Sequence, residues 1–102
     1  MTEAKPWEIS WAYVAFEDRA DGKRRPVLVL ENGEIYAIAL KITSHEARNI
    51  WGEYEIVQWK TAGLSKPSTI RVTRRLRLRN EDLDEKIGDL QLMDIANLKR
   101  YL

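Results

Sequence analysis

Apolar residues recur along most of the chain at the short spacing that is typical of β-strands. Residues 9–16 and 53–59 alternate between the two faces of a strand, and residues 69–79 do so over a longer stretch. Residues 26–31 and 34–42 are rich in aliphatic residues on both faces, which predicts strands that are buried on both sides. The pattern therefore predicts five strands, with the two most apolar ones at the centre of the sheet.

Asn32-Gly33 separates the two central strands and predicts a tight hairpin. Both residues tolerate the positive φ that a primed turn requires. The hairpin places Arg25, which precedes the first strand, and Thr43, which follows the second, near the same end of the sheet. Pro26 has no N–H for a strand ladder, so it suits the start of a strand and holds Arg25 in extended geometry.

Residues 69–79 carry an arginine-rich face opposite an apolar one. The apolar face, which Arg74 interrupts, consists of Ile70, Val72, Leu76 and Leu78. The opposite face consists of Thr69, Arg71, Thr73, Arg75, Arg77 and Arg79. Such a face requires either solvent or a bound anion.

The two ends of the chain frame this sheet. We expect residues 1–8 to form a loose arm and residues 80–85 to form a polar turn or one helical turn. Residues 90–102 predict a C-terminal helix, and its apolar stripe consists of Leu92, Ile95, Leu98 and Leu102. The expected fold is one mainly β domain over residues 1–102, a small barrel of about five to seven antiparallel strands with a C-terminal helix.

The composition excludes several kinds of catalytic site. The 102 residues include no cysteine, which excludes disulfides, thiolate metal sites and cysteine nucleophiles. The single histidine, His45, argues against a histidine metal site, and we expect neither a metal nor a cofactor. The N-terminus lacks a secretion signal and no apolar run reaches membrane-spanning length, so we expect a cytoplasmic protein without a membrane partner.

The net charge of +1 conceals a strong segregation of charge along the chain. Residues 66–79 contain six cations and no acid, whereas residues 80–94 contain six acids and one cation, Lys86. Binding follows the local electrostatic field rather than the total charge, so a polyanionic partner fits this sequence.

Polar residues collect at the ends of the predicted strands, and their chemistry suits metal-free cleavage of RNA. The ribose 2′-OH can attack the adjacent phosphate if a base removes its proton, cations hold the phosphorane charge, and an acid protonates the leaving 5′-oxygen. Arg25 suits the cationic role, and His45 is the one side chain whose reference pKa suits proton transfer. Thr43 and Ser44 can donate hydrogen bonds to phosphates or bases. The alternative is an ordinary solvated basic turn before Pro26 and a histidine that begins a short helix.

Several short motifs, taken in order, resemble the MazF/PemK-type toxins of bacterial toxin–antitoxin pairs. They are residues 25–30 (RPVLVL), 41–45 (KITSH), 54–57 (YEIV), 62–64 (AGL), 66–71 (KPSTIR) and 86–88 (KIG). The resemblance implies an SH3-like β-barrel that forms a homodimer and acts as a metal-independent, sequence-selective endoribonuclease on single-stranded RNA. It also implies products with a 2′,3′-cyclic phosphate and a 5′-hydroxyl. A cognate antitoxin would block the RNA groove, and DNA would be contacted only through the antitoxin complex.

The resemblance assigns roles to particular residues. Arg25 matches the catalytic arginine of the family's Arg-Pro motif, and Thr43 matches an active-site threonine. Arg71 lies where some members carry a catalytic arginine. The loop of residues 17–24 corresponds to one that contacts RNA. The RNA-binding candidates are Lys23, Arg24, Lys41, Ser44, Ser68, Arg71 and Arg75.

The chain also departs from the family pattern, and the departure concerns the general base. Some members place an aspartate base two residues after the arginine that matches Arg71, and that position is Thr73 here. The usual Gly-Asp near the first strand is Ile9-Ser10. We therefore take His45 as the candidate base, and the fallback is Glu17 or Asp18.

Two other functions fit the same residues. One is a non-catalytic barrel whose arginine face binds nucleic acid without cutting it. The other is a toxin-fold protein that acts on a protein target such as gyrase. Trp51, Tyr54 and Trp59 fit base stacking, but they fit the core or a dimer interface as well.

Overall fold

The strands of the computed structural model, which describes residues 4–15, 22–44 and 51–102, form one antiparallel sheet. They are β1 (Glu8–Ala15), β2 (Gly22–Asn32), β3 (Tyr36–Thr43), β4 (Glu53–Glu55), β5 (Thr69–Arg79) and β6 (Leu83–Asp89). Their order across the sheet is β4-β5-β3-β2-β1-β6. A helix, α1 (Leu92–Leu98), and a 3₁₀ turn (Lys99–Tyr101) complete the chain, so the prediction of a mainly β fold with a C-terminal helix is confirmed.

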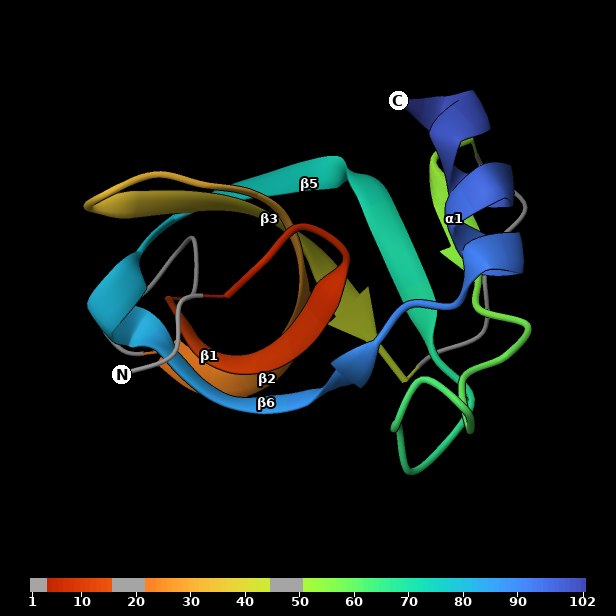
Figure 1. Ribbon diagram of the computed structural model, residues 1–102, viewed down its shortest axis with the longest axis horizontal. Coiled ribbons are helices and arrows are strands. Elements are labelled where there is room, and N and C mark those ends of the chain that lie inside the picture. The colour runs from red at the N-terminus through yellow and green to blue at the C-terminus, as the bar shows by residue number, and fades with distance from the viewer. Residues whose placement is uncertain (1–3, 16–21, 45–50) are drawn as a thin grey trace.

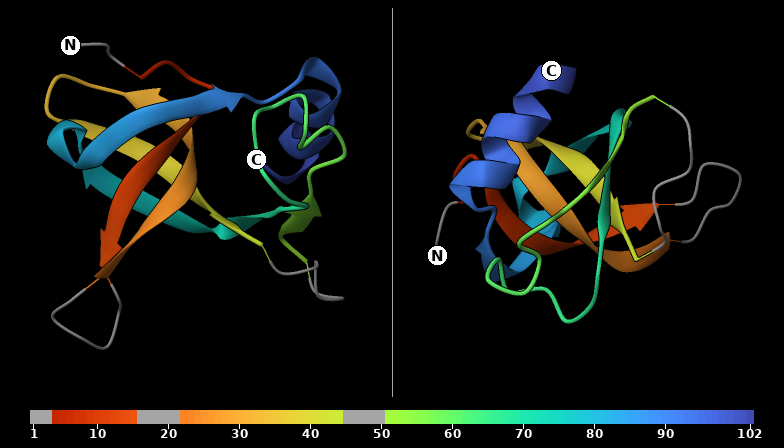
Figure 2. Two further views of the ribbon diagram at one scale, coloured as in Figure 1. Left: turned by 90° about the horizontal axis from the view of Figure 1, so that it is seen from below. Right: turned by 90° about the vertical axis from the view of Figure 1, so that its right-hand side faces the viewer.

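The sheet coils on itself into a small barrel (Figure 1). Strands β1, β2 and β6 curl around one side, and β3 and β5 cross the other. Helix α1 stands outside this curl, beside β4, and both views of Figure 2 place it at the same end of the molecule as the loop that follows β4. None of the helices in the part of the chain that the structure describes is long and apolar enough to span a bilayer.

Strand β5 bends sharply, and the bend divides the sheet into two parts. The register of β3 against β5 shifts between Leu40, which faces Arg75, and Lys41, which faces Arg71. Residues 72–74 of β5 lie between these two positions, which is the geometry of a bulge that increases local coiling. The N-terminal half of β5 therefore pairs with both β4 and β3, and the C-terminal half pairs with β3.

The two central strands are buried as their sequence predicts. Val27, Leu28 and Val29 of β2 are all fully buried, because one face of the sheet packs inside the coil and the other packs under the helix and loops. The main cluster joins Leu28 to Leu98 of α1. A second cluster contains Ala12, Val14, Val27, Ala39 and Leu78.

The hairpin between β2 and β3 exists, but the prediction of a tight primed turn at Asn32-Gly33 was wrong. Residues 33–35 form the loop, and the Gly33 N–H donates to the Tyr36 carbonyl at 2.8 Å. Neither Asn32 nor Gly33 has a positive φ. The longer loop is held by Asn80, whose side-chain amide donates to the carbonyls of Gly33 and Glu34 at 2.8 and 3.0 Å.

Strand β4 is shorter than the predicted strand of residues 53–59. Asp94 of α1 is fully buried and accepts hydrogen bonds from the backbone N–H groups of Val57 and Gln58, both at 2.9 Å. It also accepts a short hydrogen bond from the Tyr54 hydroxyl. These donors are therefore satisfied by a carboxylate rather than by a strand ladder, and the chain turns away from the sheet after Glu55.

The apolar stripe predicted for the terminal helix was also wrong in part. Leu92 is 85% exposed and Leu102 is 46% exposed, whereas Asp94 and Leu98 are buried. The helix faces the rest of the protein with Asp94 and Leu98, because the Asp94 carboxylate accepts hydrogen bonds from the backbone of Val57 and Gln58. It is also shorter than predicted, with its last turn in 3₁₀ geometry.

Strand β6 lies where the sequence predicts only a turn. Residues 80–82 do form a 3₁₀ turn, but Leu83–Asp89 then pairs with β1 in an irregular register. Its side chains are exposed or half-buried, so the segment shows no apolar alternation. Pairing of the backbone with β1 makes this segment a strand.

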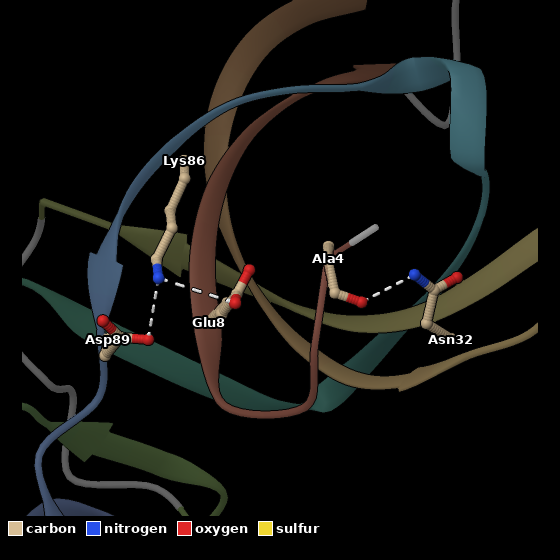
Figure 3. Close-up of polar contacts among 5 residues, drawn as sticks. All are labelled: Ala4, Glu8, Asn32, Lys86 and Asp89. Atoms are coloured by element: carbon tan, nitrogen blue, oxygen red, sulfur yellow. Dashed lines mark hydrogen bonds and ion pairs between the residues drawn. The ribbon is translucent and has the colours of Figure 1, made fainter. Parts of the chain in front are cut away.

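The described part of the N-terminal arm, residues 4–8, is attached to the sheet rather than loose. The Trp7 N–H donates to the Val29 carbonyl at 2.7 Å, and the Leu90 N–H donates to the Trp7 carbonyl at 2.9 Å. Figure 3 shows the polar contacts of Ala4 and Glu8. Asn32 donates to the Ala4 carbonyl at 2.6 Å, and Lys86 pairs with Glu8 of β1 at 3.5 Å and with Asp89 at 3.2 Å.

Candidate functional site

A groove of about 520 Å³ opens where β2 begins and β3 ends. Its described lining is strongly basic and also contains hydroxyl groups and apolar side chains. The lining residues predicted from the sequence are Lys23, Arg24, Arg25, Thr43, Ser44 and Ser68. The lining residues that were not among the candidates predicted from the sequence include Trp11, Leu64, Lys66 and Ile87.

The sheet brings Arg25 and Thr43 to the same groove. Val27 of β2 faces Lys41 of β3 in the last pair of their ladder, and Arg25 and Thr43 each lie two residues beyond it at the same end of the two strands. Arg25 is half-buried and Thr43 is 7% exposed, so a rigid part of the sheet holds both. The prediction that they lie at the same end of the sheet is thus met.

A row of opposed side chains begins at Thr43 and continues across the next two strands. Thr43 faces Thr69 of β5, and Thr69 faces Glu55 of β4. Directly opposed residues on neighbouring strands have Cβ atoms about 4.5–5.5 Å apart and point to the same face of the sheet. Two hydroxyls and a carboxylate therefore lie in sequence across the ends of these three strands.

A second row lies two residues away along the same strands and contains Lys41 and Arg71. These two predicted residues face each other, and Arg71 in turn faces Glu53. The Arg71 Nε lies 3.8 Å from a Glu53 carboxylate oxygen, and the Glu53 side chain is only 5% exposed. Arg71 therefore neutralises a buried carboxylate. Neither Lys41 nor Arg71 is part of the described groove lining.

Arg24 is held at the rim of the groove by two neighbours. Its guanidinium lies 4.8 Å from the centre of the Trp11 ring, which is a cation–π distance, and its Nε lies 3.1 Å from Asp84 of β6. Both partners of this ion pair are about half exposed, and such pairs contribute only about 0–1 kcal/mol. An incoming phosphate can therefore replace Asp84 at low cost.

The remaining predicted residues fall outside the groove or outside the described chain. Arg75 lies beyond the bend of β5, opposite Leu40, and is exposed. His45 directly follows Ser44 but lies outside the described residues, as do Glu17 and Asp18.

A close contact between two glycines positions the apolar wall of the groove. A Cβ at Gly88 of β6 would lie 1.8 Å from the Ala62 carbonyl oxygen, and a Cβ at Gly63 would lie 2.5 Å from the Ile87 carbonyl oxygen. Gly63 also has a φ of 101°, which favours glycine. The loop that carries Leu64 and Lys66 therefore sits directly on β6. The resemblance flagged this Ala-Gly-Leu run, but strand pairing patterns gave no indication of the contact.

A smaller hollow of about 240 Å³ adjoins the groove, and Ser44 and Ser68 line both spaces. Glu55 and Trp59 lie on its other walls. The Ser68 hydroxyl donates to the Lys66 carbonyl at 2.9 Å. No group of three or more potential metal-ligating His, Cys, Asp or Glu side chains occurs within residues 4–15, 22–44 and 51–102.

Comparison with known protein families identifies one family. The family of PemK-like, MazF-like toxins of type II toxin–antitoxin systems matches residues 5–102. No curated protein matches the chain. Among solved structures, the Mycobacterium tuberculosis toxin MazF-mt6 is similar at 21% identity with a TM-score of 0.70, over 90% of each chain.

Two further solved structures share the fold. An endoribonuclease from a mycobacterial species has 12% identity and a TM-score of 0.75, over 97% of this chain and 86% of that one. A toxin of M. tuberculosis has 21% identity and a TM-score of 0.66, over 87% of this chain and 93% of that one. At these identities the structural likeness establishes the fold.

Proposed function

Because the chain belongs to the PemK-like, MazF-like toxin family of type II toxin–antitoxin systems, we propose that it is an endoribonuclease toxin that cleaves single-stranded RNA. The observation that carries the proposal is that Arg25 and Thr43 line the same basic groove. One of the similar structures is itself an endoribonuclease, which supports the same activity here.

The proposed reaction uses the substrate's own ribose as the nucleophile. The 2′-oxygen loses its proton to a base and attacks the adjacent phosphorus, and the bond to the 5′-oxygen breaks as that oxygen gains a proton. The products are a 2′,3′-cyclic phosphate and a 5′-hydroxyl. Because the nucleophile belongs to the RNA, the step needs no metal-bound water, and we propose that it is metal-independent.

Arg25 and Thr43 act on the phosphate in this mechanism. The Arg25 guanidinium presents a planar set of N–H donors that matches two phosphoryl oxygens, and its charge offsets the charge of the phosphorane. The Thr43 hydroxyl donates a hydrogen bond to the same group. Arginine suits proton transfer poorly because its pKa lies above about 12. We assign proton transfer to His45, with Glu17 or Asp18 as the fallback.

We propose that the other predicted residues attract and position the RNA strand. Lys23, Arg24 and Lys66 supply positive charge around the groove, and Ser44 and Ser68 supply hydroxyls. Lys41, Arg71 and Arg75 lie outside the lining, so we expect smaller effects from them.

The family also suggests the partners of this toxin. We propose that a cognate antitoxin covers the groove, that the toxin acts as a homodimer in the cytoplasm, and that it meets DNA only through the antitoxin complex. An antitoxin that covers the groove competes directly with RNA, so complex formation should abolish both RNA binding and cleavage.

Sequencing of RNA 5′ ends after incubation with purified protein in EDTA tests the proposed function. We expect the wild type to produce 5′-hydroxyl ends at a restricted set of sequences. Arg25→Ala should slow single-turnover cleavage about a thousandfold, because it removes the main charge that stabilises the phosphorane. Arg79→Ala is the matched control, since Arg79 is exposed and pairs with Glu81 away from the groove.

Two outcomes would contradict this proposal. RNA binding without cleavage by the wild type would indicate a non-catalytic nucleic-acid-binding barrel. The absence of both RNA binding and RNA cleavage, together with co-purification of a topoisomerase, would indicate a toxin that acts on a protein target.

A further inference from the structure

The hollow beside the groove has the size and position of a site for one nucleobase. Its volume of about 240 Å³ lies below the range of about 300–1,000 Å³ that is typical of drug-sized ligands, so it suits a single ring system. It shares Ser44 and Ser68 with the phosphate groove, so the two spaces adjoin and one RNA strand can contact both of them.

The strand register gives the distance between the two spaces. Thr43 faces Thr69 and Thr69 faces Glu55, so Glu55 lies two strands away from the phosphate-binding threonine. Neighbouring strands are about 4.8 Å apart, which makes this separation about 10 Å between backbones. A base extends away from its own phosphate, so a phosphate at Thr43 puts an adjacent base within reach of Glu55.

Glu55 and Ser68 supply hydrogen-bond acceptors to the hollow. The Glu55 carboxylate accepts hydrogen bonds and cannot donate them when ionised. The Ser68 hydroxyl already donates its proton to the Lys66 carbonyl, which leaves its oxygen as an acceptor. Glu55 also has a contact within the protein, but a carboxylate offers about four acceptor sites and can serve a second partner.

The backbone donors of the same wall are already used. The Ile56 N–H donates to the Ser68 carbonyl at 3.0 Å, and the Val57 N–H donates to Asp94 at 2.9 Å. The half-buried Trp59 indole supplies an aromatic surface on which a base can stack. The site therefore favours a flat ligand whose edge carries N–H donors.

We propose that this hollow binds the base next to the scissile phosphate and that Glu55 selects guanine there. Guanine presents two adjacent donors, N1–H and the N2 amino group, which match the two oxygens of a carboxylate. Adenine and cytosine present one amino donor beside a ring acceptor, and uracil presents one donor between two carbonyls. The assignment rests on the RNA groove proposed above and adds a base preference to it.

Fluorescence anisotropy with short RNAs tests the proposal without requiring cleavage. The probes are uridine heptamers with guanosine, inosine or uridine at the centre, all carrying 2′-fluoro riboses, which lack the attacking hydroxyl. We expect the full-length wild type to bind the guanosine heptamer about tenfold more tightly than the all-uridine heptamer. Inosine retains N1–H and lacks the N2 amino group, so its affinity should be intermediate.

Glu55→Gln is the decisive variant because it keeps the shape of the side chain and replaces one acceptor by a donor. It should bind the three heptamers with affinities within about twofold of one another. Glu31→Gln is the control, since Glu31 is an exposed carboxylate in β2 outside the described lining of both spaces and should retain the guanosine preference. Thermal melting verifies that both variants fold.

The other outcomes separate this proposal from the proposed function. Equal binding of all three heptamers by the wild type, or a guanosine preference that survives Glu55→Gln, would overturn the base site. A slower cleavage rate with a displaced pH profile and an unchanged base preference would also overturn it, by making Glu55 the proton acceptor. A guanosine preference that depends on Glu55 in a protein that cuts no RNA would support the base site and refute the nuclease.

Discussion

Gly88 shows how one missing side chain shapes the candidate site. The Ala62 carbonyl oxygen occupies the place of a Cβ at this position, so the loop after β4 approaches β6 backbone to backbone. The same loop carries Leu64 and Lys66 to the groove. Gly88 has no chemical role, but it therefore determines the position of the loop that forms one wall of the groove.

Gly88→Ala should destabilise the protein strongly. The new methyl group would lie 1.8 Å from the Ala62 oxygen, so backbone must move on at least one side. Overpacking of this kind costs about 3 kcal/mol, which lowers the melting temperature of a domain of this size by about 10–20 °C. Differential scanning calorimetry measures the change.

Gly33→Ala is the control for this prediction. Its Cβ would lie 3.3 Å from the Tyr36 carbonyl oxygen, and Gly33 has no positive φ. Its effect should stay within about 1 kcal/mol. If both variants have the same melting temperature as the wild type, the loop does not pack on β6 as described.

At the scale of elements, α1 is attached to the sheet through a buried carboxylate. Asp94 accepts hydrogen bonds from Val57, Gln58 and the Tyr54 hydroxyl. These contacts end β4 after Glu55 and turn the following segment toward the hollow beside the groove. The helix thus supports the site from behind, without contributing a residue to its described lining.

The Tyr54 contact gives the stability of the protein a pH dependence at high pH. Burial, followed by the hydrogen bond to Asp94, raises the pKa of the Tyr54 hydroxyl from 10.0 to about 12. The folded state therefore holds this proton more tightly than the unfolded state. The resulting stabilisation is complete below about pH 10 and is lost as the pH rises through about 12.

Comparison of the wild type with Tyr54→Phe isolates this contribution. The difference in melting temperature between the two proteins should be constant from pH 7 to 9 and should change in favour of Tyr54→Phe between pH 10 and 12. The two proteins differ only in this hydroxyl group, so a change in the difference reports its proton. Parallel curves up to pH 12 would show that the fold does not raise the pKa of the Tyr54 hydroxyl.

At the scale of the whole molecule, the cations divide into two groups. One group surrounds the groove and includes Lys23, Arg25 and Lys66. The other lies along the C-terminal half of β5, where the Arg77 guanidinium stacks 4.1 Å from the centre of the Tyr36 ring. Several acids of residues 80–94 form ion pairs, as in the pairs of Asp84 with Arg24 and of Asp89 with Lys86.

The salt dependence of RNA binding distinguishes these two groups. For single strands, each neutralised phosphate contributes about −0.7 to the slope of log K against log salt. Lys66→Ala should therefore make the slope shallower by about 0.7, and Arg77→Ala should leave it unchanged. Anisotropy titrations over a range of salt concentrations measure both slopes. If Arg77→Ala makes the slope shallower by the same amount, the bound RNA also contacts β5.

Much of the fold follows from local pattern. Residues 26–31 are apolar on both faces, and such a segment must be buried on both sides wherever the chain places it, as Val27, Leu28 and Val29 are. The alternation in residues 69–79 likewise predicts the bounds of β5. The sequence could place Arg25 and Thr43 near the same end of the sheet because a hairpin makes its two strands antiparallel neighbours, whatever the geometry of its turn.

Other features depend on contacts between residues far apart in the chain, which no local pattern records. Strand β6 exists because its backbone pairs with β1, and β4 ends because Asp94 takes the next two N–H groups. Glu55 comes into line with Thr43 only through the register of β5 with both β3 and β4. The sequence by itself thus specified strands β1, β2, β3 and β5 and the hairpin between β2 and β3, because burial and period are local properties. The other residues that line the groove with Arg25 and the hollow beside it depend on register and packing, which exist only in the folded chain.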